Sequence, residues 1–116
     1  MPRAKRGPKS RQRKNRIFKQ AKGYVGGRRK LWKTARRAVE RAQSYAYRDR
    51  KVRKRDFRAL WIVRIGAAAR ESGLTYSKLM GGLKRAGVSI DRKILAELAV
   101  NNPEGFAKIV EVAKSL

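Results

Sequence analysis

Hydrophobic positions are sparse in the first half of the chain and follow helical spacing in the second half. Residues 1–10 contain two prolines and a glycine but almost nothing to bury, which favours an extended, disordered basic arm. Residues 11–22 predict a short basic helix with a small apolar patch of Ile17, Phe18 and Ala21. Three glycines then follow within five residues and predict a break in the helix.

A long helix is predicted from Arg28 to Ser72, because this segment has no proline and a single glycine. In the middle of the segment, residues 48–56 contain one apolar residue, so we allow for a bend or joint near residues 48–52. The first part of the helix carries a narrow apolar stripe at steps of four and three residues. The stripe comprises Leu31, Ala35, Ala38, Ala42 and Tyr45.

Three short helices are predicted after Gly73. Thr75 and Asp91 are suitable N-caps for the first two, and Asn102 followed by Pro103 is typical of the start of the third. Two adjacent glycines, at positions 81 and 82, weaken the first of these helices or allow another backbone to approach closely.

These three helices are expected to cover the apolar run LWIVRI at the end of the long helix, together with Phe57. The predicted core comprises Leu60, Trp61, Ile65, Leu79, Leu83, Ile94, Leu98, Phe106, Ile109 and Val110.

The pattern therefore predicts an all-α protein with three parts. Residues 1–27 form a basic arm with a short helix and a glycine-rich turn. Residues 28–58 form a long basic helix, and residues 59–116 form a small globular helical domain.

The charge of the chain points to a polyanionic partner. It has 33 Lys and Arg against 8 Asp and Glu, for a formal net charge of +25, and residues 1–60 hold 24 of these cations but only three acids. Such an excess repels itself strongly unless a polyanion neutralises it. Nucleic acid is the leading partner, and an anionic membrane surface is a weaker rival. The alternative function is structural: a histone-like protein that compacts DNA.

Enzymatic and metal chemistry find little support in the sequence. The chain has no Cys and no His, which removes thiolate and imidazole ligands and the commonest general base. The acids of the second half are scattered, and no glycine-rich phosphate loop follows a strand. We expect no cofactor, no small-molecule substrate and no membrane-spanning segment.

The densest basic stretch, from Tyr47 to Arg58, has seven Lys and Arg and two acids, of which Asp49 is expected to hold Arg53 one turn later. Near Arg92, a helix N-terminus with exposed cations favours a phosphate. Four aromatics of the basic part are equally compatible with stacking on bases and with internal packing: Tyr24, Trp32, Tyr45 and Tyr47. The expected nucleic-acid contacts are Arg3, Lys5, Arg6, Lys9, Arg11, Arg13, Lys14, Arg16, Lys19, Lys22, Tyr24, Arg28, Arg29, Lys30, Trp32, Lys33, Arg36, Arg37, Arg41, Tyr47, Arg48, Arg50, Lys51, Arg53, Lys54, Arg55, Arg58, Arg64, Lys78, Lys84, Arg85, Arg92 and Lys93.

Four motifs resemble one family in the same order along the chain. They are KQAKGY, SYAYRDRKVRKRDFRALWIVRI, YSKLMGGLKRAG and DRKILAELA, and they are similar to the bacterial and organellar large-subunit ribosomal protein twenty family. The basic-to-aromatic block KRDFRALWIVRI is the most specific of them. The family usually has Asn after this block, where this chain has Gly66.

The resemblance implies a protein that binds large-subunit rRNA directly, beside neighbouring ribosomal proteins on a cytoplasmic or organellar ribosome. It implies a basic extension buried among rRNA helices and a small all-α domain on the rRNA surface. It also implies a role early in large-subunit assembly, without part in peptide-bond chemistry. Some members repress their own operon by binding a leader mRNA, which we hold as a hypothesis for this chain.

Overall fold

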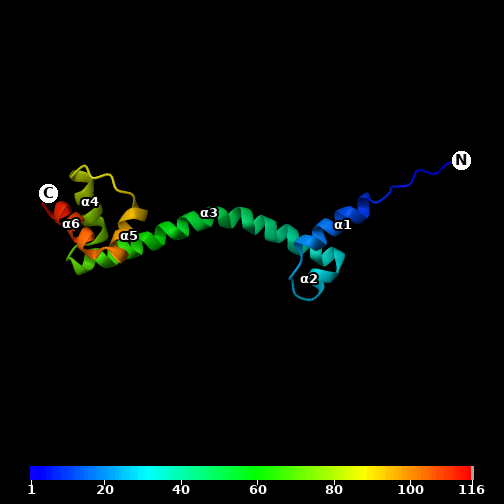
Figure 1. Ribbon diagram of the computed structural model, residues 1–116, viewed down its shortest axis with the longest axis horizontal. Helices are drawn as coiled ribbons and strands as arrows, with labels where there is room; N and C mark the ends of the chain where they lie inside the picture. Colours follow the sequence, from blue (N-terminus) through cyan, green and yellow to red (C-terminus); the bar gives the residue numbers. More distant parts are fainter. Residues whose placement is uncertain (116) are drawn as a thin grey trace. The chain divides into compact units, whose positions relative to one another are not determined.

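The computed structural model describes residues 1–115, which contain six helices and no strand (Figure 1). The predicted all-α class is confirmed. The chain divides into an N-terminal unit, Met1–Lys51, and a C-terminal unit that begins at Val52. In order along the chain, the helices are α1 (Lys9–Gln20), α2 (Gly27–Lys30), α3 (Trp32–Glu71), α4 (Tyr76–Arg85), α5 (Arg92–Asn101) and α6 (Pro103–Lys114).

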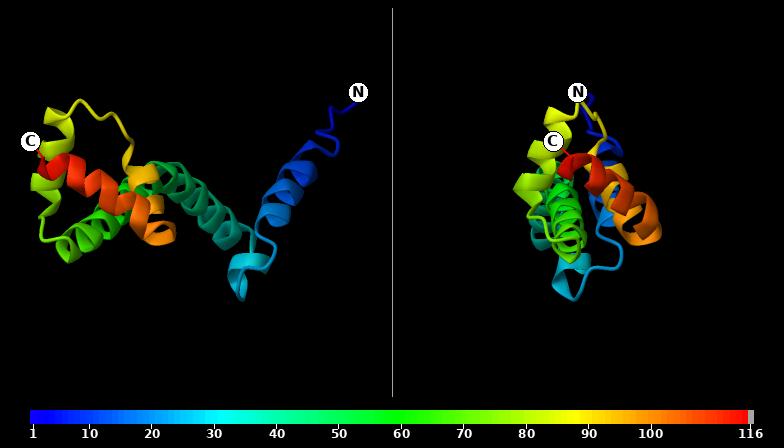
Figure 2. Two further views of the ribbon diagram at one scale, coloured as in Figure 1. Left: turned by 60° about the vertical axis from the view of Figure 1, so that its left-hand side comes forward. Right: turned by 90° about the vertical axis from the view of Figure 1, so that its left-hand side faces the viewer.

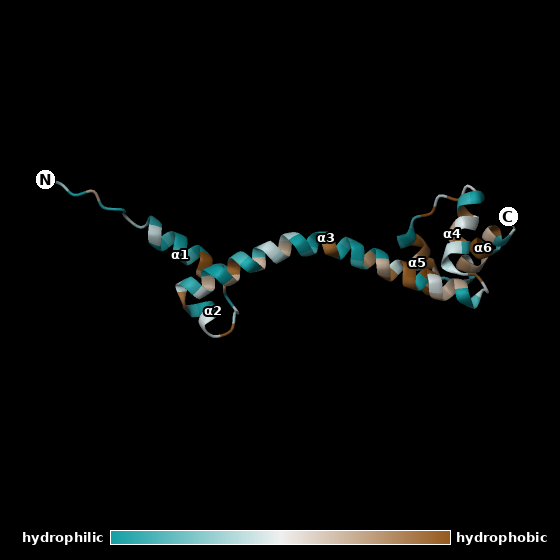
Figure 3. Ribbon diagram, turned by 180° about the vertical axis from the view of Figure 1, so that it is seen from behind, coloured by the Kyte–Doolittle hydropathy of each residue, from teal (hydrophilic) through white to brown (hydrophobic). Residues whose placement is uncertain are grey.

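A small apolar cluster holds the N-terminal unit together. Ala21, Ala35 and Val39 are buried, and Ile17 and Phe18 pack against them from α1. Figure 3 shows the corresponding change along α1, whose first turns are hydrophilic and whose last turn is hydrophobic. The predicted patch on the first helix is therefore the surface that pairs α1 with α3.

The long helix begins later than predicted. A single turn, α2, is followed by Leu31 in an extended conformation, and α3 starts at Trp32. Trp32 packs edge-on against Phe18, with ring centroids 5.9 Å apart. Helix propensity favours no interruption at residue 31, and it contains no information about this contact with α1. Through residues 48–52, α3 remains helical without a break.

Capping side chains set the starts of α4, α5 and α6, as predicted. The Thr75 side chain accepts a hydrogen bond from the Lys78 backbone N–H at 3.4 Å, and that of Asp91 accepts from Lys93 N–H at 3.3 Å. Asn102 Oδ1 accepts from the Gly105 N–H at 2.9 Å. Each cap satisfies a backbone donor that has no partner within its helix.

Glycines with positive φ follow the ends of α3 and α4. Gly73 has φ of 81° and Gly87 has φ of 70°. After each glycine the chain turns back on the helix: Leu74 N–H donates to Ala69 C=O at 2.9 Å, and Val88 N–H donates to Leu83 C=O at 3.0 Å. This six-to-one bond is the Schellman ending, which needs a residue in the left-handed region.

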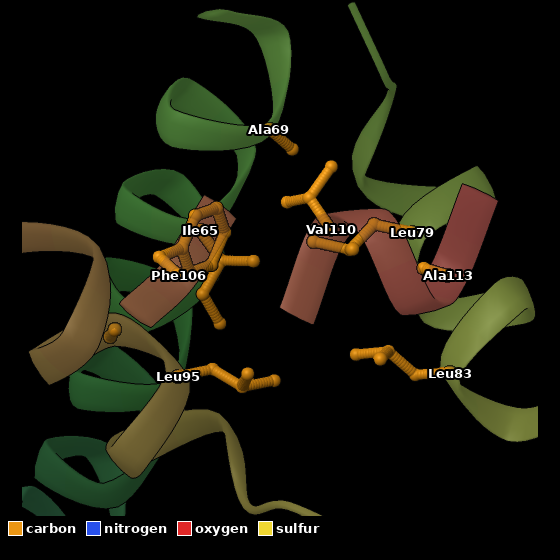
Figure 4. Packing of buried hydrophobic residues seen from close by; sticks show 9 residues of the cluster. Ile65, Ala69, Leu79, Leu83, Leu95, Phe106, Val110 and Ala113 are labelled. Carbon is orange, nitrogen blue, oxygen red and sulfur yellow. The ribbon is translucent and has the colours of Figure 1, made fainter. Parts of the chain in front are cut away.

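In the C-terminal unit, α4, α5 and α6 gather around the end of α3 (Figure 2). Helix α6 packs against both α4 and α5. Side chains from all four helices converge on one core (Figure 4). Its buried members are Ile65, Ala69, Leu79, Leu83, Leu95, Ala96, Phe106, Val110 and Ala113.

The remaining predicted core residues fall into two groups. Trp61, Leu98 and Ile109 are half-buried and pack against the core. Leu60 and Ile94 were predicted to be core residues and are instead exposed, at 40% and 49%.

Phe57 and Val63, which were expected at the same packing end, are exposed as well. Helix α3 is apolar on more than one side here, whereas the short helices cover only the side of Ile65 and Ala69. On α5, Leu95 and Ala96 face the core in place of Ile94. The tertiary contacts, rather than hydrophobicity, select the buried face.

Candidate nucleic-acid interface

Nearly every side chain predicted to contact RNA is exposed. All of the predicted Lys and Arg side chains from Arg3 to Arg58 are exposed, and so are Arg64, Lys78, Lys84 and Arg85. Tyr24, Trp32 and Arg92 are half-buried. The cations are therefore placed in water, where an incoming phosphate can reach them.

Few of these cations have an acidic partner within the chain. In the part that the structure describes, the ion pairs are Arg36–Glu40 at 3.0 Å and Arg48–Asp49 at 2.9 Å. Asp49 was expected to hold Arg53, but it pairs with its neighbour Arg48. The hydrogen bond and the charge of Asp49 raise the pKa of Arg48 above its ordinary value. The other cations of this region have no ion-pair partner among the described residues.

Two of the basic-region aromatics pack inside the N-terminal unit. Tyr24 lies against the cluster of Ala21, Ala35 and Val39. Trp32 contacts Phe18, and the Lys14 ammonium lies 5.8 Å from the Trp32 ring centroid.

Two other aromatics, Tyr45 and Tyr47, are exposed, and each carries a cation over its ring. The Arg48 guanidinium lies 4.5 Å from the centroid of Tyr45, and Lys51 Nζ lies 4.4 Å from that of Tyr47. An exposed ring stacked with a cation can extend the stack to a nucleic-acid base.

An open groove of about 1160 Å³ lies between the loop after α1 and the first half of α3. Both walls of the groove come from the N-terminal unit, for which the sequence predicts a basic arm and a basic helix. The groove is lined by Gly23, Tyr24, Val25, Arg28, Thr34, Arg37, Ala38, Glu40, Arg41, Ala42 and Tyr45.

The apolar stripe predicted on the long helix therefore divides between two surfaces. Ala35 is buried in the cluster against α1, whereas Ala38, Ala42 and Tyr45 line the groove. Leu31 belongs to neither surface and is 61% exposed. The spacing of the stripe was visible in the sequence, but the loop that faces it was not.

The predicted contact residues that follow Gly73 lie on α4 and α5. Lys84 and Arg85 occupy the last turn of α4, where a cation is favourable to the helix dipole. Arg92 Nε donates to the Tyr76 hydroxyl at 2.8 Å, which links the starts of the two helices. Because Asp91 already caps α5, the N-terminus of this helix is occupied by a carboxylate.

Within residues 1–115, none of the helices is both long and apolar enough to cross a membrane. The same part of the chain holds no group of three acids that could bind a metal ion.

Comparison with known proteins gives the family of the chain. Residues 3–109 match the family model described as Ribosomal protein L20. The large ribosomal subunit protein bL20 of Geobacter metallireducens is 63% identical over 115 residues, which cover 99% of this chain and 98% of the relative. The proteins of the same name from Geotalea daltonii and Syntrophotalea carbinolica are 62% and 61% identical over the same shares. The chain belongs to the ribosomal protein L20 family.

Proposed function

We propose that this protein is a structural constituent of the large ribosomal subunit that binds large-subunit rRNA directly. The observation that carries the proposal is the succession of exposed cations along the first 58 residues, of which only Arg36 and Arg48 have an acidic partner. The bL20 relatives are named as proteins of the large ribosomal subunit, so this subunit is the particle in which we expect the chain to act.

The mechanism follows from charge and shape. Arginines bind phosphate oxygens with two parallel hydrogen bonds, and the counterions released by the RNA favour binding. We propose that residues 1–27 thread between rRNA helices, that residues 28–58 lie along phosphates, and that residues 59–116 sit on the rRNA surface. The C-terminal domain would recognise RNA shape and backbone, because the A-form major groove is too narrow for side chains.

The protein would act as a scaffold rather than as a catalyst. Its binding energy favours the compact arrangement of rRNA helices over open arrangements, which suits a role early in large-subunit assembly. Neighbouring ribosomal proteins are further expected partners. Peptide-bond chemistry needs no residue of this chain.

Sedimentation of a cell lysate through a sucrose gradient tests the proposal. We expect the protein to comigrate with large subunits after a high-salt wash and to be released by ribonuclease. Comigration with nucleoid DNA and release by deoxyribonuclease would instead favour the DNA-compacting alternative. A protein that stays at the top of the gradient contradicts both functions.

We also propose that the protein represses its own synthesis through a leader mRNA. The support is that the segment from Val52 onward forms a compact unit of its own, so it can bind an RNA other than the ribosomal one. Expression of the full chain should lower translation of a reporter fused to its own leader and not that of a reporter with an unrelated leader. Equal effects on both reporters would count against repression.

A further inference from the structure

The groove of the N-terminal unit has the features of a binding site for unpaired nucleotides. Its volume of about 1160 Å³ exceeds the ~300–1,000 Å³ of ordinary small-molecule pockets. Because it is open, it suits a strand that enters and leaves rather than an enclosed metabolite.

One face of α3 forms the floor of the groove. Ala38 and Ala42 are four residues apart, and Tyr45 follows three residues later, so they lie on one side of the helix. The two alanines are half-buried and present only methyl groups. A flat apolar floor of this kind accepts the face of a base without offering a competing hydrogen bond.

Tyrosines and an arginine beside the groove provide surfaces on which bases can stack. Tyr24 lines the groove from the loop and Tyr45 lines it from α3. Arg48, which is not part of the lining, stacks on Tyr45 with its guanidinium 4.5 Å from the ring centroid. Aromatic rings stack on bases, and Arg strengthens that stack.

Three arginines in the lining can neutralise the phosphates of the same strand. They are Arg28, Arg37 and Arg41, and all three are exposed. Glu40 is the acid of the lining, and its Oε1 accepts a hydrogen bond from Arg36 Nε at 3.0 Å. A carboxylate repels phosphate but accepts hydrogen bonds from the amino and imino groups of bases, so base edges rather than phosphates belong beside Glu40.

We propose that this groove binds a short stretch of single-stranded RNA, with bases on Ala38 and Ala42 between the two tyrosines. The inference deepens the proposed function and rests on it: the site would hold unpaired rRNA, whereas the rest of the basic surface contacts helices through phosphate. A duplex cannot use the groove in this way, because its bases are already stacked and paired.

Filling the floor of the groove without changing the charge tests the proposal in the full chain. The substitution Ala42→Leu adds an isobutyl group to the floor and keeps a good helix former. Ala46→Leu is the matched control, because Ala46 lies on the same helix, is exposed and does not line the groove. Affinities are measured by fluorescence anisotropy over a range of salt concentrations. The probes are a labelled single-stranded oligouridine and a blunt-ended RNA duplex with the same number of phosphates.

We expect Ala42→Leu to weaken oligouridine binding roughly tenfold, which is the loss of about one stacked base. The slope of affinity against salt should not change, since no phosphate contact is removed. Duplex binding, and both affinities of Ala46→Leu, should match the unsubstituted chain. Equal losses on both RNAs, or equal effects of the two substitutions, would overturn the proposal.

Photocrosslinking of the unsubstituted chain gives a readout that does not depend on folding of a variant. An oligonucleotide containing 5-iodouridine should crosslink to Tyr24 or Tyr45, as located by mass spectrometry of the peptides. Crosslinks confined to residues outside the groove would exclude this site. If that happens while the protein still comigrates with large subunits, the groove proposal fails and the ribosomal function stands. Absence from large subunits would remove the ribosomal function itself.

Discussion

At the scale of single residues, this protein depends on small side chains at a few positions where the backbone or a helix cap needs them. Gly82 and Asn102 are the clearest cases. Each follows a residue of the same type, Gly81 or Asn101, that does not make the same contact. A Cβ added at Gly82 would lie 2.5 Å from the Ala113 carbonyl oxygen of α6, whereas a Cβ at Gly81 meets no atom within 4 Å. The two adjacent glycines therefore have different roles.

We predict that Gly82→Ala destabilises the protein by about 1–3 kcal/mol, the usual cost of overpacking a core. The α4 and α6 backbones would have to separate to relieve the contact with Ala113. Gly81→Ala is the control and should stabilise by up to about 1 kcal/mol, because only helix propensity changes. Urea unfolding followed by circular dichroism measures both. A Gly82→Ala chain as stable as the Gly81→Ala chain would contradict the close approach.

We predict that Asn102→Ala costs about 0.5–2 kcal/mol of unfolding free energy, because it removes the N-cap of α6. The lost bond is the one from Gly105 N–H to Asn102 Oδ1, at 2.9 Å. Asn101→Ala, one residue earlier on the exposed end of α5, removes an amide without removing a cap. Thermal unfolding of both variants measures the difference. Similar melting temperatures would show that the cap contributes little.

At the scale of elements, the helices differ in what holds them in place. The helices of the C-terminal unit share one core, in which Leu79, Leu95 and Phe106 are buried. In contrast, α1 and the start of α3 share a cluster whose buried members are two alanines and one valine. Burial of a valine side chain stabilises the folded state by about 1.5–3 kcal/mol, and burial of an alanine stabilises it by less. This small sum must offset the conformational entropy that is lost when both helices become ordered.

We predict that the N-terminal unit opens much more readily than the C-terminal unit in the free protein. Repulsion between like charges on α1 and α3 adds to the small size of its cluster. Hydrogen exchange of the full chain should be fast from residues 9 to 47 and slow in α4, α5 and α6. Addition of rRNA should slow exchange mainly in the first of these regions, since a ligand stabilises the state that binds it. Equal protection of the two units without RNA would contradict this prediction.

At the scale of the whole molecule, the distribution of charge decides what the protein binds. The excess of cations lies in residues 1–60, with 24 Lys and Arg against three acids, whereas residues 61–116 have nine against five. In isolation this excess opposes folding of the N-terminal unit, and on a polyanion it drives association. The N-terminal unit, which we predict to be the less stable one, therefore lies within the more basic part of the chain.

We predict a steep dependence of rRNA affinity on salt. If about ten phosphates are contacted, the log–log slope should be near −7 to −9. Replacing Arg28, Arg29 and Lys30 of α2 by Gln should reduce its magnitude by roughly 2–3. The matched control replaces Arg70, Lys108 and Lys114 by Gln, which removes the same charge outside the expected contacts. Filter binding at several salt concentrations measures all three slopes. An equal reduction in both triple variants would show that net charge, not specific contacts, governs binding.

The sequence by itself determined the features that depend on local chemistry. Caps at Thr75, Asp91 and Asn102 could be predicted, because capping acts over three residues. The all-α class and the charge that implies nucleic acid also follow from composition and spacing. For Gly81 and Gly82 the sequence left open a weakened helix or a close approach, and the contact of Gly82 with Ala113 decided between them. The family motifs gave the same assignment that the comparisons later showed.

Only the tertiary structure decided which of several apolar faces is used. Leu60 and Ile94 are as hydrophobic as Ile65 and Leu95, yet the first two are exposed and the last two are buried. Helix α3 starts at Trp32, whose ring lies against Phe18 from another helix, and helix propensity contains no information about that contact. The groove likewise needs the loop after α1 to face Ala38 and Ala42. Burial and enclosure depend on pairs of segments distant along the chain, and helical periodicity contains no information about which segments meet.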